Sequence, residues 1–259
     1  MSNVRAYEGI KETAGQAEGV HDFLTLEQPL SIAINGQPFT LTMQTPGDEI
    51  DLTRGLLLTE GALKKGVEPA HIDITGKSAE GYISAVNVVL DESLLRDVQL
   101  NKRSLLSVAS CGICGKTELD VPQGMLDISS DQLSTEHVDR MFETMQAGQS
   151  AFLSSGGCHA AAAFNAAHQL IALREDIGRH NAVDKVIGAL MQDGRLKDAR
   201  FLLVSGRVSY EIVVKCIAAG IPNLLAVSAP SSLAVDFCKE LGIALYGFCR
   251  EGRFTIYNR

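Results

Sequence analysis

Apolar residues occupy every second position early in the chain. Leu30, Ile32 and Ile34 precede Asn35-Gly36, and Phe39, Leu41 and Met43 follow it. This alternation predicts a β-hairpin, and Asn-Gly is typical of the two-residue type I′ turn because both of its positions need positive φ. Residues 1–27 are polar and show no such period, so we expect them to form a poorly ordered tail.

Shorter elements follow the hairpin up to about residue 130. Asp48 is placed to cap a helix over residues 49–60. A β run covers residues 82–90, and a short apolar strand over 105–109 leads into a Cys-Gly-Ile-Cys-Gly segment. We therefore expect a small α+β domain over residues 28–130 that ends in this segment.

The pattern changes after residue 130. Apolar residues first recur with helical spacing at Val138, Met141, Phe142 and Met145. Short, continuously apolar runs then alternate with helices of about ten to twelve residues, which predicts βαβ units and a mostly parallel sheet covered on both faces. We expect this α/β domain to span residues 131–259 and to bind ligands beyond the strand C-terminal ends. The apolar runs are 160–164, 170–174, 201–204, 224–227 and 244–248.

Composition and charge narrow the class of protein. Of the 259 residues, 46% are hydrophobic and 21% are charged, which excludes a largely disordered chain. No apolar stretch approaches the ~18 residues of a membrane span, and no signal-peptide core is present, so we expect a cytoplasmic protein that does not associate with membranes. A net charge of −8 argues against broad binding to nucleic acid. Residues 1–150 carry a net charge of −11 and residues 151–259 one of +3, which leaves room for a local anion site in the second part.

The most distinctive feature is the pair of thiols at Cys111 and Cys114, in the segment Cys-Gly-Ile-Cys-Gly. Two thiols at this spacing can be metal ligands, a redox dithiol, or a nucleophilic thiolate with a helper. A closed zinc site needs four ligands, and the remaining cysteines include no second pair, so we expect no metal. The glycines favour a flexible loop, and an accessible thiol there suits a protein that takes an atom from one partner and hands it to another, because the sulfur must visit two sites. A tight turn with two packed thiols is the structural alternative.

Polar residues gather where predicted strands run into helices. Residues 174–185 form the densest group, Arg-Glu-Asp-Ile-Gly-Arg-His-Asn-Ala-Val-Asp-Lys, and we expect a loop there. Arg179, His180 and Lys185 are expected to meet an anion that also uses the free amide groups of the next helix. Cys158 and His159 follow two glycines, whose simplest role is close backbone approach, and both are further candidates for lining a pocket.

Other residues of these junctions have simpler expected roles. Asn181 is placed to cap the helix that follows, and Glu175 and Asp184 are expected to lie in solvent. Ser205 and Arg207, on either side of a glycine after the run 201–204, repeat the anion-binding pattern. Glycine permits close approach there, and a hydroxyl and a guanidinium group precede a helix.

Four segments in this order resemble the FdhD/NarQ family of formate dehydrogenase accessory sulfurtransferases. The resemblance runs from about residue 28 to the C-terminus, and the four together are far more specific than any one alone. The segments are Cys-Gly-Ile-Cys-Gly, Gly-Gly-Cys-His-Ala-Ala, the twelve residues 174–185, and Ser-Gly-Arg-Val-Ser-Tyr-Glu.

The resemblance implies a cytoplasmic sulfur carrier. Such a sulfurtransferase accepts sulfur as a persulfide from a cysteine desulfurase and passes it to the molybdenum cofactor, in its bis-molybdopterin guanine dinucleotide form, before the cofactor enters apo formate dehydrogenase. Cys111 matches the residue that carries the persulfide, and Cys114 would assist or resolve it. A homodimer is usual for the family. A cofactor-binding chaperone without sulfur transfer and a dithiol redox protein remain the alternatives.

The resemblance also implies a fold and a cofactor site. Family members resemble cytidine deaminases, with three α/β layers, although this chain lacks the His-x-Glu and Pro-Cys-x-x-Cys signature of zinc deaminases. Arg179, His180, Ser205 and Arg207 are further candidates for contacting the cofactor. The family's cofactor stretch maps onto Phe248, Cys249, Arg250, Glu251, Gly252 and Arg253.

Overall fold

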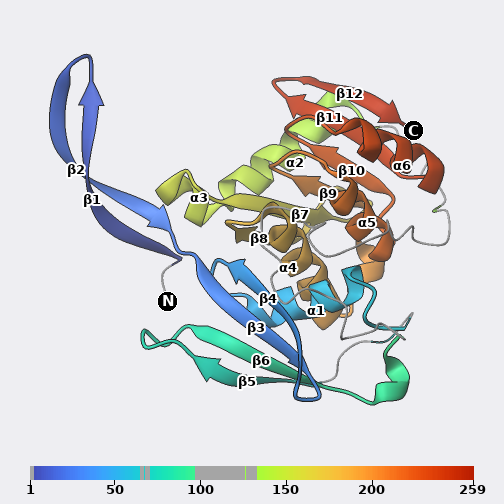
Figure 1. Ribbon diagram of the computed structural model, residues 1–259. Coiled ribbons are helices and arrows are strands. Elements are labelled where there is room, and N and C mark those ends of the chain that lie inside the picture. The colour runs from blue at the N-terminus through green and yellow to red at the C-terminus, as the bar shows by residue number, and fades with distance from the viewer. Residues whose placement is uncertain (1–2, 65–66, 68–70, 97–125, 127–132) are drawn as a thin grey trace.

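The computed structural model describes residues 3–64, 67, 71–96, 126 and 133–259. It is a mixed α/β structure with a two-stranded, a four-stranded and a six-stranded sheet. In Figure 1 the small hairpin rises away from the body, the four-stranded sheet lies below, and the six-stranded sheet with its helices forms the largest part. The predicted strand at 105–109 and the Cys111–Cys114 segment lie outside the described residues.

The first sheet corrects the prediction of a poorly ordered tail. Strands β1 (Val4–Thr13) and β2 (Gln16–Thr25) pair antiparallel along their whole length. Most of their side chains are exposed, so the pairing depends on backbone hydrogen bonds and leaves no apolar period for the sequence to show. The feature of the sequence that indicates this hairpin is its turn, where Ala14 and Gly15 both have positive φ.

The second sheet contains the predicted hairpin. Its strands are ordered β4-β3-β6-β5, and Asn35 and Gly36 both have positive φ, which confirms the type I′ turn. The predicted helix is confirmed as α1, which packs its apolar side on this sheet. Asp48 stands at its N-cap position but makes no capping hydrogen bond. The elements are β3 (Gln28–Ile34), β4 (Gln37–Gln44), α1 (Glu49–Thr59), β5 (His71–Lys77), β6 (Ile83–Val89) and the 3-10 turn η1 (Glu92–Leu94).

The third sheet has the order β12-β11-β10-β9-β7-β8. Its helical and extended elements alternate much as predicted. The elements are α2 (Thr135–Ala147), α3 (Ser150–Ser155), β7 (His159–Phe164), β8 (Leu170–Asp176), α4 (Arg179–Gln192), η3 (Leu196–Asp198), β9 (Phe201–Val204), α5 (Tyr210–Ala218), β10 (Asn223–Ala226), α6 (Ser232–Leu241), β11 (Ala244–Arg250) and β12 (Arg253–Asn258).

The expectation of a mostly parallel sheet is wrong in detail. Strands β9, β10 and β11 are parallel, whereas β7, β8 and β12 pair antiparallel with their neighbours. The connection between β7 and β8 is too short for the crossover that parallel strands need, and His168 has positive φ within it. The β11–β12 connection is likewise a tight turn, with positive φ at Glu251 and Gly252.

The six-stranded sheet forms the middle of three layers. Helices α4, α5 and α6 cover one face and α2 covers the other (Figure 1). Side chains alternate between these two cores along β7, where Ala161 and Ala163 face α4 while Ala160 and Ala162 face α2. None of the helices in the described ranges has the length and apolarity that crossing a membrane requires.

Helices α1 and α4 cross so closely that two glycines are required at the contact. A Cβ atom added to Gly55 would lie 1.8 Å from the carbonyl oxygen of Asp184. One added to Gly188 would lie 1.8 Å from the carbonyl oxygen of Asp51. The helix from the first part of the chain is therefore in backbone contact with a helix from the second part, on opposite sides of the predicted boundary at residue 130.

Candidate functional site

The predicted strand-to-helix junctions come together at one edge of the six-stranded sheet. Strands β8 to β11 end at this edge, and β7, which runs in the opposite direction, begins there. Ser205 follows β9, and its Oγ accepts a hydrogen bond from the backbone N–H of Ala160 at 3.0 Å. The same Oγ lies 3.4 Å from Nδ1 of His159. Arg179 begins α4 beside them, with its Cδ 3.5 Å from where a Cβ of Gly206 would stand.

The junction at 174–185 is not the polar loop that the sequence predicts. Strand β8 continues to Asp176 and α4 begins at Arg179, so only two residues connect them. The carboxylate of Asp176 is fully buried and accepts hydrogen bonds from the N–H of Gly178 at 2.7 Å and from the N–H of Thr45 at 2.9 Å. An internal carboxylate thus already serves as the anion at the start of this helix.

Two further expectations for this segment are wrong. Lys185 is fully buried and pairs with Asp176 at 2.8 Å, so it cannot reach a ligand at the surface. Asn181 does not cap α4, because the helix starts two residues earlier; its amide donates to the carbonyl of Met43 at 2.7 Å instead. Asn181 thereby holds α4 against the end of β4, and Lys185 also donates to the carbonyl of Thr45, directly after β4, at 2.6 Å.

The two acids expected in solvent are buried. Glu175 accepts hydrogen bonds from the N–H groups of Ala151 and Phe152, each at 2.8 Å, at the start of α3. Asp184 pairs with Lys215 at 2.8 Å and accepts a hydrogen bond from Thr59 at 2.7 Å. These partners lie far away in the sequence, which is why charge density alone suggested a solvated loop.

His180 is not a surface cation. Its side chain is buried against α5, with Nε2 at 3.3 Å from Oγ of Ser209 and 3.9 Å from Glu211. Burial, followed by the charges of Lys215 and Arg179, lowers the pKa of His180 to about 4. The imidazole is therefore neutral at pH 7 and contributes no positive charge to an anion site.

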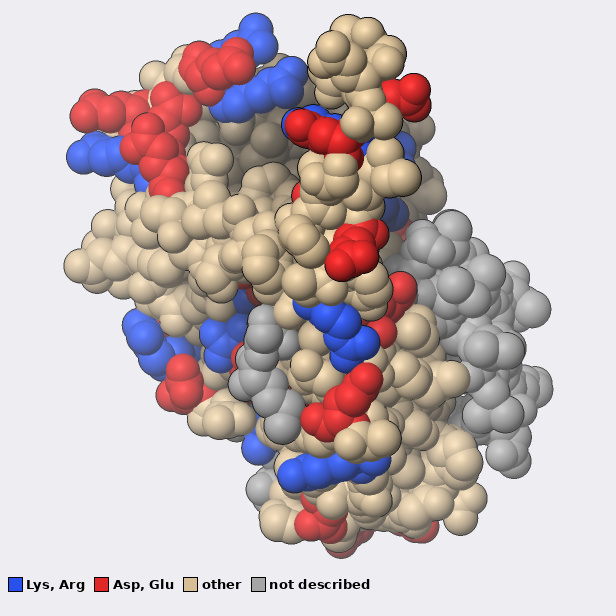
Figure 2. Space-filling view, turned by 90° about the vertical axis from the view of Figure 1, so that its left-hand side faces the viewer, with Lys and Arg blue, Asp and Glu red and all other residues tan. Residues whose placement is uncertain are grey.

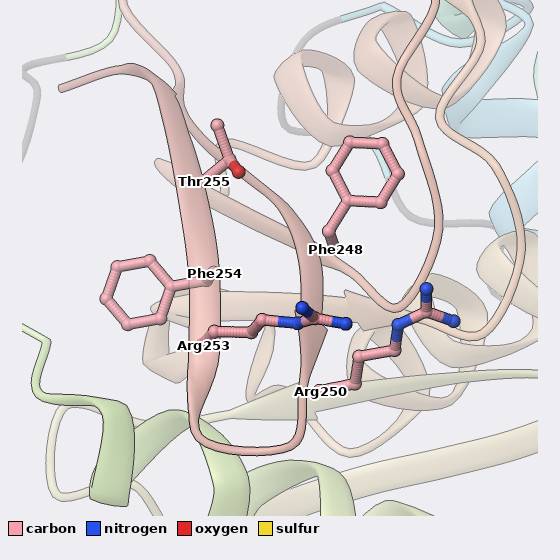
Figure 3. A pocket seen from close by; sticks show the side chains of 5 residues that line it. All are labelled: Phe248, Arg250, Arg253, Phe254 and Thr255. Carbon is pink, nitrogen blue, oxygen red and sulfur yellow. The ribbon is translucent and has the colours of Figure 1, made fainter.

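A pocket of about 300 Å³ lies at the β11–β12 hairpin, within the stretch matched to the family's cofactor site. Figure 3 shows the guanidinium groups of Arg250 and Arg253 next to each other and the ring of Phe248 on the same side of the hairpin, whereas the ring of Phe254 is directed away from them, toward Tyr246. Phe248 has positive φ at an irregularity in the β11–β12 pairing, and its side chain is exposed. An exposed aromatic ring beside paired guanidinium groups suits a planar base with a phosphate. Thr255 completes the lining.

Three residues of that stretch do not line this pocket. Cys249 points to the opposite side of β11 and is 1% exposed within the core that faces α2. Burial raises the pKa of Cys249 to about 12. Glu251 and Gly252 form the tight turn, and the N–H of Gly252 donates to Asp139 at 3.3 Å. The alternation of side chains along a strand accounts for the correction at Cys249.

The described cysteines are unsuited to nucleophilic chemistry. Cys158, Cys216, Cys238 and Cys249 are free and buried. Burial raises the pKa of all four, to about 12 for Cys158, Cys238 and Cys249. The thiolate is the reactive form, so these groups are inert near neutral pH. Across the described ranges, His, Cys, Asp and Glu side chains nowhere converge in the threes that a metal ion needs.

The charges on one side of the molecule are mixed. Figure 2 shows Lys and Arg interspersed with Asp and Glu on this face, without a large patch of one sign. Arg207 is exposed at the sheet edge, and Arg250 and Arg253 are exposed at the pocket. An anion site on this face would therefore be local and built from a few side chains.

Comparison with known proteins identifies the family. The model of the FdhD/NarQ family matches residues 25–259. The chain belongs to this family. It is 43% identical over 242 residues to the sulfur carrier protein FdhD of Nocardia farcinica, covering 92% of this chain and 86% of the relative. It is 35% identical over 255 residues to the FdhD of Sulfolobus acidocaldarius, covering 94% and 92%.

A solved structure confirms the fold of this FdhD/NarQ family member. It comes from Desulfotalea psychrophila and is assigned provisionally as a formate dehydrogenase accessory protein. The two structures superpose with a TM-score of 0.77 at 20% sequence identity, over 100% of this chain and 98% of the other. The likeness covers the six-stranded sheet and its edge together with the rest of the chain.

Proposed function

We propose that this protein carries sulfur to the molybdenum cofactor, in its bis-molybdopterin guanine dinucleotide form, before formate dehydrogenase takes the cofactor up. The observation that carries the proposal is family membership, since curated relatives of this chain over nine-tenths of its length are sulfur carrier proteins. Cys111 is the proposed persulfide carrier and Cys114 its partner. Buried, inert thiols at the four described cysteines support placing the chemistry on this pair.

The loading step is a sulfur exchange that needs no oxidant. The Cys111 thiolate attacks the outer sulfur of a persulfide on a cysteine desulfurase, forming a new S–S bond on Cys111. The S–S bond of the donor breaks, and the donor cysteine leaves as a thiolate. Cys111 then holds the transferred sulfur as a persulfide.

The release step can use the second thiol. Attack by the Cys114 thiolate on the inner sulfur forms a Cys111–Cys114 disulfide and releases the outer sulfur as sulfide. The two electrons that reduce the sulfur come from the two thiols, so the step is balanced. An external dithiol reductant then returns the disulfide to two thiols.

The pocket at the β11–β12 hairpin is the proposed contact for the cofactor. Arg250 and Arg253 would hold a phosphate of the guanine dinucleotide, and Phe248 would pack on a ring. The pocket of about 300 Å³ holds only part of so large a molecule, so further residues at the same sheet edge are needed. The cofactor supplies the metal centre that receives the sulfur, and the protein positions it.

Mass spectrometry tests sulfur loading. The reduced protein is incubated with a cysteine desulfurase and cysteine, and wild type is compared with Cys111→Ala and Cys114→Ala. We expect the mass of one added sulfur on the Cys111 peptide, absent in Cys111→Ala and retained in Cys114→Ala. Because the second thiol acts in release, Cys114→Ala should accumulate the persulfide.

Other outcomes favour the alternatives. No added sulfur on any cysteine, with guanosine diphosphate still bound, would favour a cofactor-binding chaperone. A chaperone should also activate formate dehydrogenase as the Cys111→Ala variant. A defined reduction potential that requires both thiols, without sulfur loading, would favour a dithiol redox protein.

A further inference from the structure

We infer that His159, Ser205 and Arg179 form a binding site for a phosphate group, separate from the pocket at the β11–β12 hairpin. The inference rests on the proposed function only for the identity of the molecule that carries the phosphate, which we take to be a nucleoside diphosphate unit. The site lies where β7 begins, β9 ends and α4 begins.

Hydrogen bonds tie the Ser205 hydroxyl to the His159 ring and to the start of β7. Ser205 Oγ accepts from the N–H of Ala160, so its own proton is free to point to His159 Nδ1, 3.4 Å away. When the Ser205 hydroxyl donates to Nδ1, the proton of the neutral ring sits on Nε2. Burial and the charge of Arg179 lower the pKa of His159, which keeps the ring neutral at pH 7. In that tautomer, His159 offers an N–H donor on Nε2 that has no acceptor among the described residues.

Arg179 provides the positive charge. Its Nε is buried and has no hydrogen-bond partner within the described residues. A buried donor left without an acceptor costs about 1–3 kcal/mol, so native proteins rarely keep one. Asp176 and Glu211 act on this region through their charges, but in the described part of the chain neither forms an ion pair with Arg179. A phosphate oxygen would supply the missing acceptor.

Gly206 leaves space beside these groups. A Cβ atom added there would stand 3.4 Å from His159 Nδ1 and 3.5 Å from the Cδ of Arg179, which is ordinary contact without a clash. The two side chains therefore converge on the backbone of the residue that follows Ser205. Alanine at position 206 would narrow this space without straining the fold.

The position in the sheet separates this site from the pocket. His159 begins β7 and Ser205 follows β9, whereas Arg250 and Arg253 lie on β11 and β12, with β10 between. Strands are spaced by about 4.8 Å, which puts the two sites roughly 10–15 Å apart along one edge. An extended nucleotide can reach from a base in the aromatic pocket to a phosphate at Arg179.

Histidine NMR with pyrophosphate as the probe tests the site. Pyrophosphate is titrated into protein with ¹⁵N-labelled histidines, and the ring signal of His159 is assigned by its loss in His159→Gln. We expect pyrophosphate to shift this signal, and Arg179→Gln to weaken pyrophosphate binding at least tenfold. Arg195→Gln is the matched control, because Arg195 lies just beyond the opposite end of α4 and is exposed. It should bind as wild type does.

Gly206→Ala is the second test and does not remove a polar group. It should keep the far-UV circular dichroism of wild type and weaken pyrophosphate binding several-fold. If Arg179→Gln fails to fold, Gly206→Ala and His159→Gln decide the question. Unchanged pyrophosphate affinity in both variants would overturn the inference.

The outcomes separate this inference from the proposed function. An unmoved His159 signal, with pyrophosphate binding lost in Arg250→Gln but kept in Arg179→Gln, would mean that the hairpin pocket alone holds phosphate. The inference would then be wrong and the sulfur-carrier proposal would stand. A shifted His159 signal without sulfur loading on Cys111 would leave the phosphate site correct and the sulfur-carrier proposal wrong.

Discussion

Charged residues behave in opposite ways at the helix junction around α1, α4 and α5 and at the nearby sheet edge. In the junction, Asp184 pairs with Lys215, and at the end of β8 Asp176 pairs with Lys185. At the edge, Arg179 forms no ion pair among the described residues. All but Lys215 belong to, or lie beside, one twelve-residue stretch of sequence. A charged side chain with an oppositely charged partner inside the protein stabilises the fold, whereas one without such a partner is available to a ligand. The partner, more than the residue type, decides which role the side chain has.

The largest expected effect comes from breaking the α1–α4 contact that encloses the paired charges. Gly188→Ala places a Cβ 1.8 Å from the backbone oxygen of Asp51, so a helix must move. We expect a loss of about 4 kcal/mol in the free energy of unfolding, or failure to fold. Urea denaturation measures it. Gly19→Ala is the control, because nothing lies within 4 Å of its added Cβ, and it should change stability by less than about 0.5 kcal/mol.

Removing one partner of a buried pair should have the next largest effect. Lys215→Met leaves the Asp184 carboxylate buried without its cation, and the pKa of Asp184, already raised by burial, should rise further. We expect a loss of about 3 kcal/mol. A double-mutant cycle with Asp184→Leu checks it. If the two single losses add to the loss in the double variant, the pair does not act as a unit.

Acidification should weaken the junction through His180. Its pKa is about 4 in the folded protein and near 6.5 when unfolded, so the unfolded state binds the extra proton between these values. The contribution is complete above pH 6.5 and is lost as the pH falls toward 4. We expect up to about 2–3 kcal/mol over this window. Stability measured at pH 7 and pH 5 should differ less in His180→Gln, and an equal difference would contradict the assignment.

The smallest expected effect concerns the exposed edge. Arg250→Gln should weaken binding of guanosine diphosphate by about tenfold, or about 1.4 kcal/mol, because one charge-assisted contact is lost. Its unfolding free energy should stay within about 0.5 kcal/mol of wild type, since the side chain is exposed. Isothermal titration calorimetry with Arg195→Gln as control measures the first quantity. Equal affinities of both variants would exclude Arg250 from the site.

Local patterns predicted the elements that bury an apolar face. The hairpin around Asn35-Gly36 and the helices α1, α2 and α6 have such faces, and their apolar periods place them correctly. The hairpin β1–β2 buries almost nothing and therefore gave no period. Whether β7 and β8 pair parallel or antiparallel depends on the length of the connection between them. The apolar runs predict the two strands but carry no information on this pairing.

The candidate site was predictable in its location and only partly in its residues. The sequence placed Ser205 and Arg179 at strand ends, and the structure brings both to one edge. It could not assign Lys185 and His180, because their partners Thr45 and Ser209 come from distant elements. Burial by long-range contacts is what converts a charged residue from a ligand group into a structural one, and it leaves no local signature.

The close crossing of α1 and α4 also affects how the chain is made. Thr59 and its hydrogen-bond partner Asp184 are 125 residues apart. At about 5–20 residues per second, a ribosome needs roughly ten seconds to extend from one to the other. During that time α1 has no helix to cover Gly55, and its contact surface is open to other chains. Chaperones therefore have most to protect while only the N-terminal part of the chain has been synthesised. The α1–α4 contact also closes a long loop, and contacts between residues so far apart in the sequence slow folding.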